Sequence, residues 1–444
     1  MAKILEIITN IKLFLNSQET IDKYRNSKED FTRSSKLGFT NTALLGIQLM
    51  KGSLSSDIYN VLTYNDLSDV TKSAYSQSRY KISNKIYTKM NNIFINSLYE
   101  KSESLSSEDL GNYLYIKKYR GYKIHAIDGS KLTLPNTNVM KKAFGIQKGG
   151  GKVTKTETAM CLFMCCYDVL NHYITDCSLN TLATGELTVA KKGVQSLDSE
   201  AITIFDRAYA SMFFCYLLQK YDKPFIIRVK VSFNKVVKAF VASDKTDSIV
   251  TFESDKSEEF DGEIMPKGTK IQVRLVKIAL PNGQTEVLMT SLFDTNTFSI
   301  ATLDELYQMR WGIETTFDRL KNQLLLTCFT GLKPEAIYQD VFATVFVHNL
   351  QQAIVNEAQV IVNEATTKCK DEYQVNNNVA AGILKNKIMK LFLSKEPKEI
   401  LEELIRIFAQ NRLAKKKSKT PQKRIKSIAK RRNLTTQANF RRAC

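Results

Sequence analysis

Residues 303–326 read LDELYQMRWGIETTFDRLKNQLLL, and this stretch decides how the chain can be interpreted. It contains no proline and a single glycine, Gly312, and its apolar residues recur at helical spacing, which predicts one helix from Leu303 to Leu326. Four polar side chains would form a row beside the apolar stripe of this helix: Tyr307, Arg310, Glu314 and Lys321. A carboxylate can bind a divalent cation, and the other three groups can donate to phosphate oxygens. The solvated face of an ordinary amphipathic helix explains the same row, so the rest of the chain has to decide between the two.

Length and composition describe a globular protein with more than one domain. A chain of 444 residues predicts two or three domains, and 43% hydrophobic with 25% charged residues is typical of a soluble protein. No apolar run approaches the length of a membrane-spanning helix, and the first residues, MAKILEIITNIKLFLNSQET, lack the cleavage site of a signal peptide. We therefore expect an intracellular protein.

Cysteine and histidine usage disfavours a zinc site. The eight cysteines are scattered without a CxxC pair, and the chain has only three histidines. Cysteines embedded in apolar runs of an intracellular protein are expected to be reduced thiols of the core.

Positive charge is concentrated in the last residues of the chain. The net charge is +19, and residues 411–444 contribute 13 Lys and Arg without any acid, which leaves 19 − 13 = +6 for the rest. Such a basic tail suits a polyanion, most often nucleic acid, although a solubilising tail has the same composition.

Residues 1–115 predict short helices with basic patches. Segments such as QSRYK at residues 77–81, which includes Arg79, could dock on DNA through phosphate contacts, so this region is a candidate DNA-binding domain. No helix-turn-helix spacing stands out, and a purely structural helical domain fits the pattern equally well.

From residue 119 the pattern changes to an α/β alternation. The expected order is strands 122–128, 158–167 and 173–179, helix 186–197, strand 201–205, helix 212–221 and strand 224–231. The first strand would end in a turn at residues 128–130, and two strands would carry Asp128 and Asp206 at their carboxyl ends. Ligands of open α/β sheets bind outside the carboxyl ends of strands, so these aspartates are candidate site residues.

The remaining segments surround this alternation. Residues 232–292 are polar, alternating and rich in turns, which predicts a β-rich insertion with strands at 271–278 and 286–291. A long apolar helix is expected at 337–362, and mixed helices are expected at 379–408.

Three carboxylates from two strand ends and a helix could bind two divalent cations through oxygen ligands. Two metals stabilise the attacking and the leaving oxygen of an in-line displacement at phosphorus, and one of them activates a water or a 3′-hydroxyl. No side-chain base is then needed, which is consistent with a chain that has three histidines.

The motifs that carry this chemistry resemble those of a known family. The spacing Y-x2-R-x3-E-x6-K over residues 307–321 resembles at every position the Y-R-E-K signature of DDE transposases of the insertion-sequence-4 family, which are bacterial cut-and-paste transposases. Asp128 in IDGSKLTLP resembles the first aspartate motif of that family, and Asp206 in FDRAYAS resembles the second, with Ala208 where the family has glycine.

The resemblance implies a role for each of these residues. The catalytic, metal-binding triad that would hold two Mg²⁺ or Mn²⁺ ions is Asp128, Asp206 and Glu314. The residues that would contact DNA phosphates or lie beside the site are Tyr307, Arg310, Lys321, Arg207 and Tyr209.

The resemblance also implies an architecture in the α/β class. The catalytic core would be ribonuclease H-like and comprise residues 116–231 and 293–362, with the insertion at 232–292. An all-helical N-terminal DNA-binding domain would precede this core. A helical, basic C-terminal region would follow it, with helices at residues 363–410 and a basic tail at 411–444. The expected partners are double-stranded DNA, as transposon ends and as target, and a second copy in a paired-end dimer. The expected location is the cytoplasm, on the nucleoid.

Three functions remain open from the sequence. The first is a transposase that binds terminal inverted repeats, cleaves the DNA ends and transfers the strands in a Mg²⁺-dependent reaction. The second is a catalytically inactive or domesticated DNA-binding relative, against which the intact triad argues. The third is a general metal-dependent nuclease on the same fold, which the Y-R-E-K row disfavours.

Overall fold

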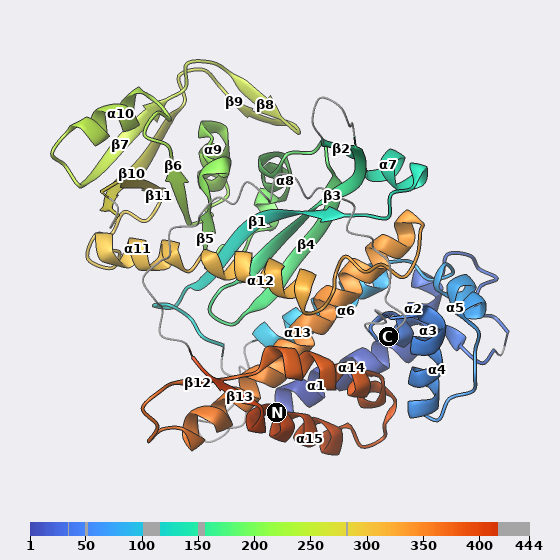
Figure 1. Cartoon of the computed structure of the whole chain (residues 1–444). Coiled ribbons are helices and arrows are strands. Elements are labelled where there is room, and N and C mark those ends of the chain that lie inside the picture. Colours follow the sequence, from blue (N-terminus) through green and yellow to red (C-terminus); the bar gives the residue numbers. More distant parts are fainter. Residues whose placement is uncertain (34, 49–51, 101–115, 150–155, 281–282, 416–444) are drawn as a thin grey trace. The chain divides into compact units, whose positions relative to one another are not determined.

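The computed structural model describes residues 1–33, 35–48, 52–100, 116–149, 156–280 and 283–415. The chain forms two compact units (Figure 1). The first comprises Met1–Ile116, Leu132–Cys161 and Asp318–Cys444, and the second comprises Lys117–Lys131 and Leu162–Phe317. Within the described part of the chain, no helix combines the length and the apolar content that crossing a bilayer requires.

The first unit is mainly helical. Its N-terminal helices are α1 (Ala2–Asn16), α2 (Gln18–Tyr24), α3 (Gly38–Gly46), α4 (Leu54–Tyr64), α5 (Lys72–Arg79) and α6 (Lys85–Tyr99). The helical spacing of apolar residues explains why these segments fold onto a core: in α1 the buried positions are Ile4, Ile7, Ile8, Ile11 and Leu15. Residues 101–115, part of the predicted N-terminal domain, lie outside the described residues.

Helix α13 (Pro334–Ala365) is the central element of the first unit and contains the predicted apolar helix 337–362. It is buried along most of its length and packs against α6 and against α15 (Pro397–Gln410). Pro334 suits the first helical turn, where a backbone N–H has no partner within the helix. The other elements of this unit are α7 (Asn138–Phe144), β2 (Ile146–Gly149), β12 (Tyr373–Val375), α14 (Asn377–Leu393) and β13 (Arg412–Ala414).

Arg79 belongs to the interior of the first unit, which corrects the expectation that its segment presents a basic surface to DNA. The Arg79 side chain is 3% exposed, and its guanidinium donates to Asp340 at 2.9 Å and to Gln339 at 2.8 Å. Both acceptors lie on α13, so Arg79 joins α5 to the central helix. The donors of Arg79 are therefore used within the first unit and not for a phosphate.

The second unit is built on a mixed sheet. Its strands are β1 (Lys123–Thr133), β3 (Thr156–Asp168), β4 (Tyr173–Thr181), β5 (Ala201–Phe205), β6 (Phe225–Val229), β7 (Asp247–Glu253), β10 (Lys270–Ala279) and β11 (Thr285–Thr290), where β1 and β3 extend a few residues into the first unit. They follow the order β3-β1-β5-β6-β11-β10-β7, and β4 pairs with β3. The pairs β1–β5 and β5–β6 are parallel, whereas β11, β10 and β7 join in antiparallel fashion.

The connections of this unit agree with the predicted alternation. Helix α8 (Glu186–Gly193) and a short 3₁₀ turn at Val194–Ser196 lead from β4 to β5, and α9 (Met212–Lys220) leads from β5 to β6. Parallel neighbours need such crossovers, because the chain has to return to the same end of the sheet.

The predicted insertion 232–292 is rich in strands, as expected. It contains β7, β10, β11 and a hairpin of β8 (Glu258–Phe260) and β9 (Glu263–Met265). It also contains an unexpected helix, α10 (Lys235–Ala242), which Asn234 caps through its side chain. Strands β11, β10 and β7 continue the sheet beyond β6. The domain boundaries expected from the sequence stay a prediction.

Two local expectations are wrong. The turn expected at residues 128–130 is absent, because β1 runs on from Asp128 to Thr133. The single helix from Leu303 to Leu326 is instead two helices, α11 (Ile300–Gln308) and α12 (Trp311–Asn322).

The break between α11 and α12 has a backbone cause. The amides of Arg310, Gly312 and Ile313 donate to the carbonyls three residues earlier, at 3.1, 2.9 and 3.1 Å, so the chain tightens by one 3₁₀-like turn. Glycine weakens a helix, and at Gly312 a Cβ would already be 3.4 Å from the ring of Tyr167. Arg310 therefore lies in a turn at the start of α12 and not in the middle of a helix.

Candidate active site

Asp128 and Asp206 lie side by side on neighbouring strands. In the parallel pair β1–β5, Ile127 is opposite Phe205, so an aspartate comes next on each side: Asp128 within β1 and Asp206 directly after the end of β5. The backbone N–H of Gly129 donates to Asp128 Oδ1 at 2.9 Å, and that of Ala208 donates to Asp206 Oδ1 at 2.6 Å. The second bond caps the 3₁₀ turn Arg207–Tyr209, which shows that Ala208 serves the turn where the family motif has glycine.

Arg310 connects the first and third predicted triad members. Its Nη2 donates to Glu314 Oε1 at 2.9 Å, and its Nη1 is 3.8 Å from Asp128 Oδ2. The arginine is 6% exposed, and its Nε is buried without a hydrogen-bond partner in the described structure. All three triad members thus belong to the second unit, and one guanidinium lies beside two of them.

A fourth carboxylate, Glu186, belongs to the same group, and the sequence analysis did not single it out. The pKa of Asp128 is raised to about 6, first of all by burial and also by the charges of Glu186 and Asp206, while the Gly129 amide and Arg310 oppose the shift. Burial and Asp206 also raise the pKa of Glu186, against Tyr209 and Lys131. The one signal in the sequence was an acid that opens a helix, which is too common at helix N-termini to be specific.

The two residues that follow Asp206 have different surroundings. Arg207 is exposed. Tyr209 has no exposed surface, and its hydroxyl donates to Glu186 Oε2 at 3.5 Å. Tyr209 therefore lies beside the carboxylate group, and a contact of Tyr209 with DNA stays a prediction.

Tyr307 and Lys321 complete the predicted row. Tyr307, on α11, is 3% exposed, and the guanidinium carbon of Arg310 is 5.9 Å from its ring centre. Lys321, near the end of α12, belongs to the first unit, where burial lowers its pKa against the charges of Asp318 and Cys161. Tyr307 and Arg310 therefore lie together in the second unit. Lys321 belongs to the first unit.

The donor set suits a hard divalent cation. Within the described residues, no group of three His, Cys, Asp or Glu side chains is arranged to hold a metal ion as it stands. The carboxylates nevertheless offer the oxygen ligands that Mg²⁺ and Mn²⁺ prefer. The salt bridge of Arg310 to Glu314 occupies Oε1 of that carboxylate.

Replacing Asp128 by asparagine is expected to stabilise the metal-free protein at pH 8. The pKa of Asp128 is about 6 in the folded chain against an ordinary value of 3.8, so the native state binds the proton more tightly and loses stability as pH rises from about 4 to about 6. Asparagine removes this cost, which amounts to about 1–3 kcal/mol at pH 8.

Urea denaturation at pH 8 and pH 4 in the presence of a chelator measures this effect, with the exposed Asp244→Asn as the matched control. The gain of Asp128→Asn over the parent has to be larger at pH 8 than at pH 4. A loss of stability at pH 8 contradicts the electrostatic picture.

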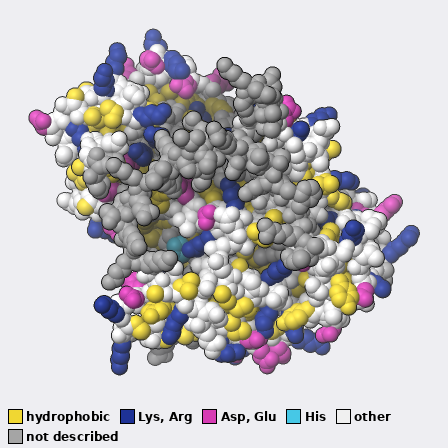
Figure 2. Space-filling model, in the orientation of Figure 1, with side chains coloured by type: hydrophobic (Ala, Val, Ile, Leu, Met, Phe, Trp, Pro, Cys, Tyr) yellow, Lys and Arg dark blue, Asp and Glu magenta, His cyan; other side chains and the backbone are white. Residues whose placement is uncertain are grey.

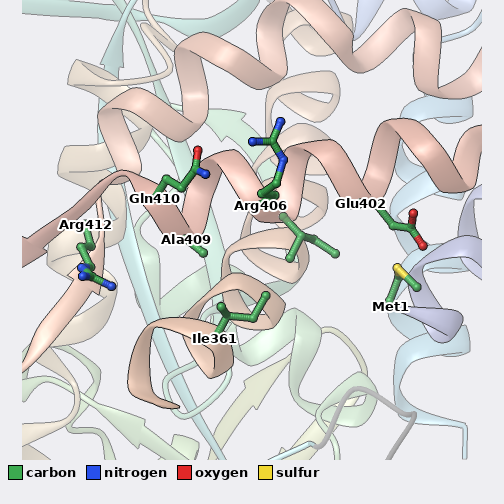
Figure 3. A pocket seen from close by; sticks show the side chains of 8 residues that line it. Met1, Ile361, Glu402, Arg406, Ala409, Gln410 and Arg412 are labelled. Carbon is green, nitrogen blue, oxygen red and sulfur yellow. The ribbon is translucent and has the colours of Figure 1, made fainter. Parts of the chain in front are cut away.

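A cavity elsewhere in the chain contains none of these residues. It lies in the first unit, has a volume of about 620 Å³ and is lined among others by Glu402, Arg406 and Arg412 (Figure 3). Its apolar floor includes Ile361 and Ala409. A site for a long, extended substrate does not need an enclosed cavity, so cavity volume is no guide to the candidate site here.

The segment that contains the motifs matches a known protein family. Residues 119–350 match a family described as Transposase DDE domain. The chain is also similar to a solved structure, a piggyBac transposase synaptic complex with hairpin DNA determined by cryo-EM, with 12% sequence identity over 94% of this chain and 86% of that chain and a TM-score of 0.43. A comparison with curated proteins gives no match. Because the matched residues make up more than half of the chain and include both aspartates, Arg310 and Glu314, this protein belongs to the family of transposases with a DDE domain.

Proposed function

We propose that this chain is a cut-and-paste transposase of the insertion-sequence-4 type, with a ribonuclease H-like catalytic core. It binds the terminal inverted repeats of its element, cleaves the DNA ends and joins them to target DNA. The observation that carries the proposal is the grouping of Asp128 and Asp206 on adjacent parallel strands, with Glu314 linked to Asp128 through Arg310.

Each residue of the group has a part in this reaction. Asp128, Asp206 and Glu314 supply oxygen ligands for two Mg²⁺ or Mn²⁺ ions. When bound, such ions supply an activated water or 3′-hydroxyl and neutralise the leaving oxygen. Burial and the neighbouring acids raise the pKa of Asp128 in the metal-free protein. A bound cation would lower this pKa, so that the carboxylate loses its proton and can act as a ligand.

Arg310 is the residue best suited to hold the scissile phosphate. Its buried Nε has no partner in the described structure, and a guanidinium can bind two phosphate oxygens at once. When a phosphate takes the guanidinium, Glu314 is released from its salt bridge to act as a ligand. Substrate arrival and completion of the carboxylate set are thereby coupled. Tyr307 packs beside Arg310 and positions it, while the exposed Arg207 is available for a phosphate further along the strand.

Binding of double-stranded DNA extends beyond this group. Lys and Arg side chains lie at many points of the described surface, as Figure 2 shows for one face. The predicted helical N-terminal domain, residues 1–115, and Lys321 of the Y-R-E-K row would add phosphate contacts, and two copies would assemble on paired ends. The basic tail would add further contacts to DNA because of its Lys and Arg residues. Residues 416–444 of this tail lie outside the described structure.

Cleavage of end-sequence DNA tests the proposal and separates it from the two alternatives. The substrate is a duplex with the inverted repeat that flanks the coding region, and a duplex of the same composition in scrambled order is the control. We expect cleavage at the end sequence with Mg²⁺ or Mn²⁺ and none with a chelator. Equal cleavage of the scrambled duplex would identify a general nuclease, and tight binding without cleavage would identify an inactive relative.

A further inference from the structure

The side chain of Glu186 lies against Gly129, the residue that follows the first aspartate. A Cβ at residue 129 would be 2.7 Å from Glu186 Cγ, 2.8 Å from its Cδ and 2.8 Å from Met164 Sδ. Real Cβ atoms do not come this close to other heavy atoms, and Gly129 does not have the positive φ that would otherwise explain a glycine. The glycine next to Asp128 therefore makes space for the Glu186 side chain.

The segment that follows Asp206 also contacts the side chain of Glu186. Tyr209 lies three residues after Asp206 and has no exposed surface, and its hydroxyl donates to Glu186 Oε2. At 3.5 Å this bond is long, so Tyr209 orients the carboxylate while leaving its oxygens able to bind a cation. Glu186 thus lies against Gly129, which follows Asp128, and against Tyr209, which follows Asp206.

The start of α8 suits an ionised carboxylate in this position. Glu186 is the first residue of the helix, and Gly185, the capping residue, provides no side-chain hydrogen bond. The positive end of the helix dipole favours negative charge at this place. The chain thus places a further acidic side chain among other acids, where an uncharged side chain would avoid the repulsion.

The buried guanidinium beside the group indicates that the acids are arranged for a ligand. Arg310 is 6% exposed, reaches Asp128 and Glu314 and still has an unpartnered Nε. An unused buried donor is costly unless an anion arrives to accept from it. A phosphate that binds this arginine would take the cation away from Asp128 and Glu314, in a group that also includes Asp206 and Glu186, and a metal ion would then balance these charges.

We propose that Glu186 is a further metal ligand of this site and that it holds a divalent cation together with Asp128 and Asp206. Glu314, which Arg310 holds, then completes the set when the phosphate binds. The inference rests on the proposed function, because it names a fourth residue for the same metal site.

Metal binding by the full chain without DNA tests this inference independently of cleavage. Mn²⁺ is titrated into the protein, and free Mn²⁺ is followed by electron paramagnetic resonance. Glu186→Gln keeps the shape of the side chain and removes its charge, and Glu186→Asp keeps the charge on a shorter chain. Glu259→Gln, an exposed glutamate on β8, is the matched control.

We expect Glu186→Gln to weaken Mn²⁺ binding by about 10-fold or more, the range seen when a residue that supports a metal site is lost. Glu186→Asp should recover part of the affinity, and Glu259→Gln should bind Mn²⁺ like the parent. Near-UV circular dichroism of each variant confirms that the fold is retained.

Asp128→Asn and Asp206→Asn separate failure of the inference from failure of the proposed function. If these two variants lose Mn²⁺ binding while Glu186→Gln keeps the parental affinity, the inference is overturned and the proposed metal site stands. If none of the three variants changes Mn²⁺ binding, both the inference and the metal site are wrong.

Discussion

Asparagine at position 128 is expected to reduce metal-dependent cleavage of the element's ends by about 10³-fold or more, while binding of end DNA stays within about twofold. The carboxylate lies next to Asp206 on the neighbouring strand, and the amide that replaces it is a weaker ligand without charge. A gel assay on labelled end duplex with Mg²⁺ measures the cleavage rate, and fluorescence anisotropy measures DNA binding.

The same loss is expected for Asp206→Asn and for Glu314→Gln. Glu305→Gln is the matched control for the helix, because Glu305 is exposed on α11 and lies outside the carboxylate group. Substantial cleavage by any of the three triad variants would falsify the assignment of that residue. Loss of DNA binding together with cleavage would point to a structural role.

Replacing Asp340 by alanine is expected to lower the free energy of unfolding by about 3–5 kcal/mol, because it leaves a buried arginine without its counter-ion. Arg79 and Asp340 have side chains that are 3% and 5% exposed, with the ion pair at 2.9 Å. Thr330 donates to the same carboxylate through its backbone N–H and its hydroxyl, so these groups would also lose their acceptor. Urea denaturation followed by far-UV circular dichroism measures the loss.

A double variant and an exposed pair provide the controls. Arg79→Met combined with Asp340→Leu removes both charges and should recover much of the lost stability, since two apolar side chains can fill the same space. Lys81→Ala, which breaks an ion pair of 3.8 Å to Asp30 with a lysine that is 49% exposed, should change the stability by less than about 1 kcal/mol. A loss as small for Asp340→Ala would contradict the role given to the buried pair.

Most elements of the second unit follow from local sequence patterns. The strand predicted at residues 201–205 coincides with β5, and the helix predicted at 212–221 ends one residue beyond α9. These segments have strong periodicity, and the residues that delimit them do so locally: Asp206 caps the turn after β5, and Ser211 caps α9. Where periodicity and capping agree, the chain needs no distant contact to choose its secondary structure.

Two of the wrong predictions concern segments whose backbone the local sequence pattern does not reveal. Asp128-Gly129-Ser130 reads as a turn, yet Gly129 continues β1 and lies against the side chains of Glu186 and Met164. Gly312 lies close to Tyr167 of β3, and the helix breaks just before it. Neither contact leaves a trace in the local pattern of apolar residues.

The sequence by itself determined the order of strands and helices and the identity of the acidic and basic residues that carry the chemistry, because periodicity, capping and motif spacing are local properties. Only the tertiary structure decided which of these residues meet. It buried Arg79 against Asp340, brought Arg310 between Asp128 and Glu314, and added Glu186 to the aspartates. Burial and charge pairing depend on residues that lie far apart in the chain, so they are fixed by packing and not by any single stretch.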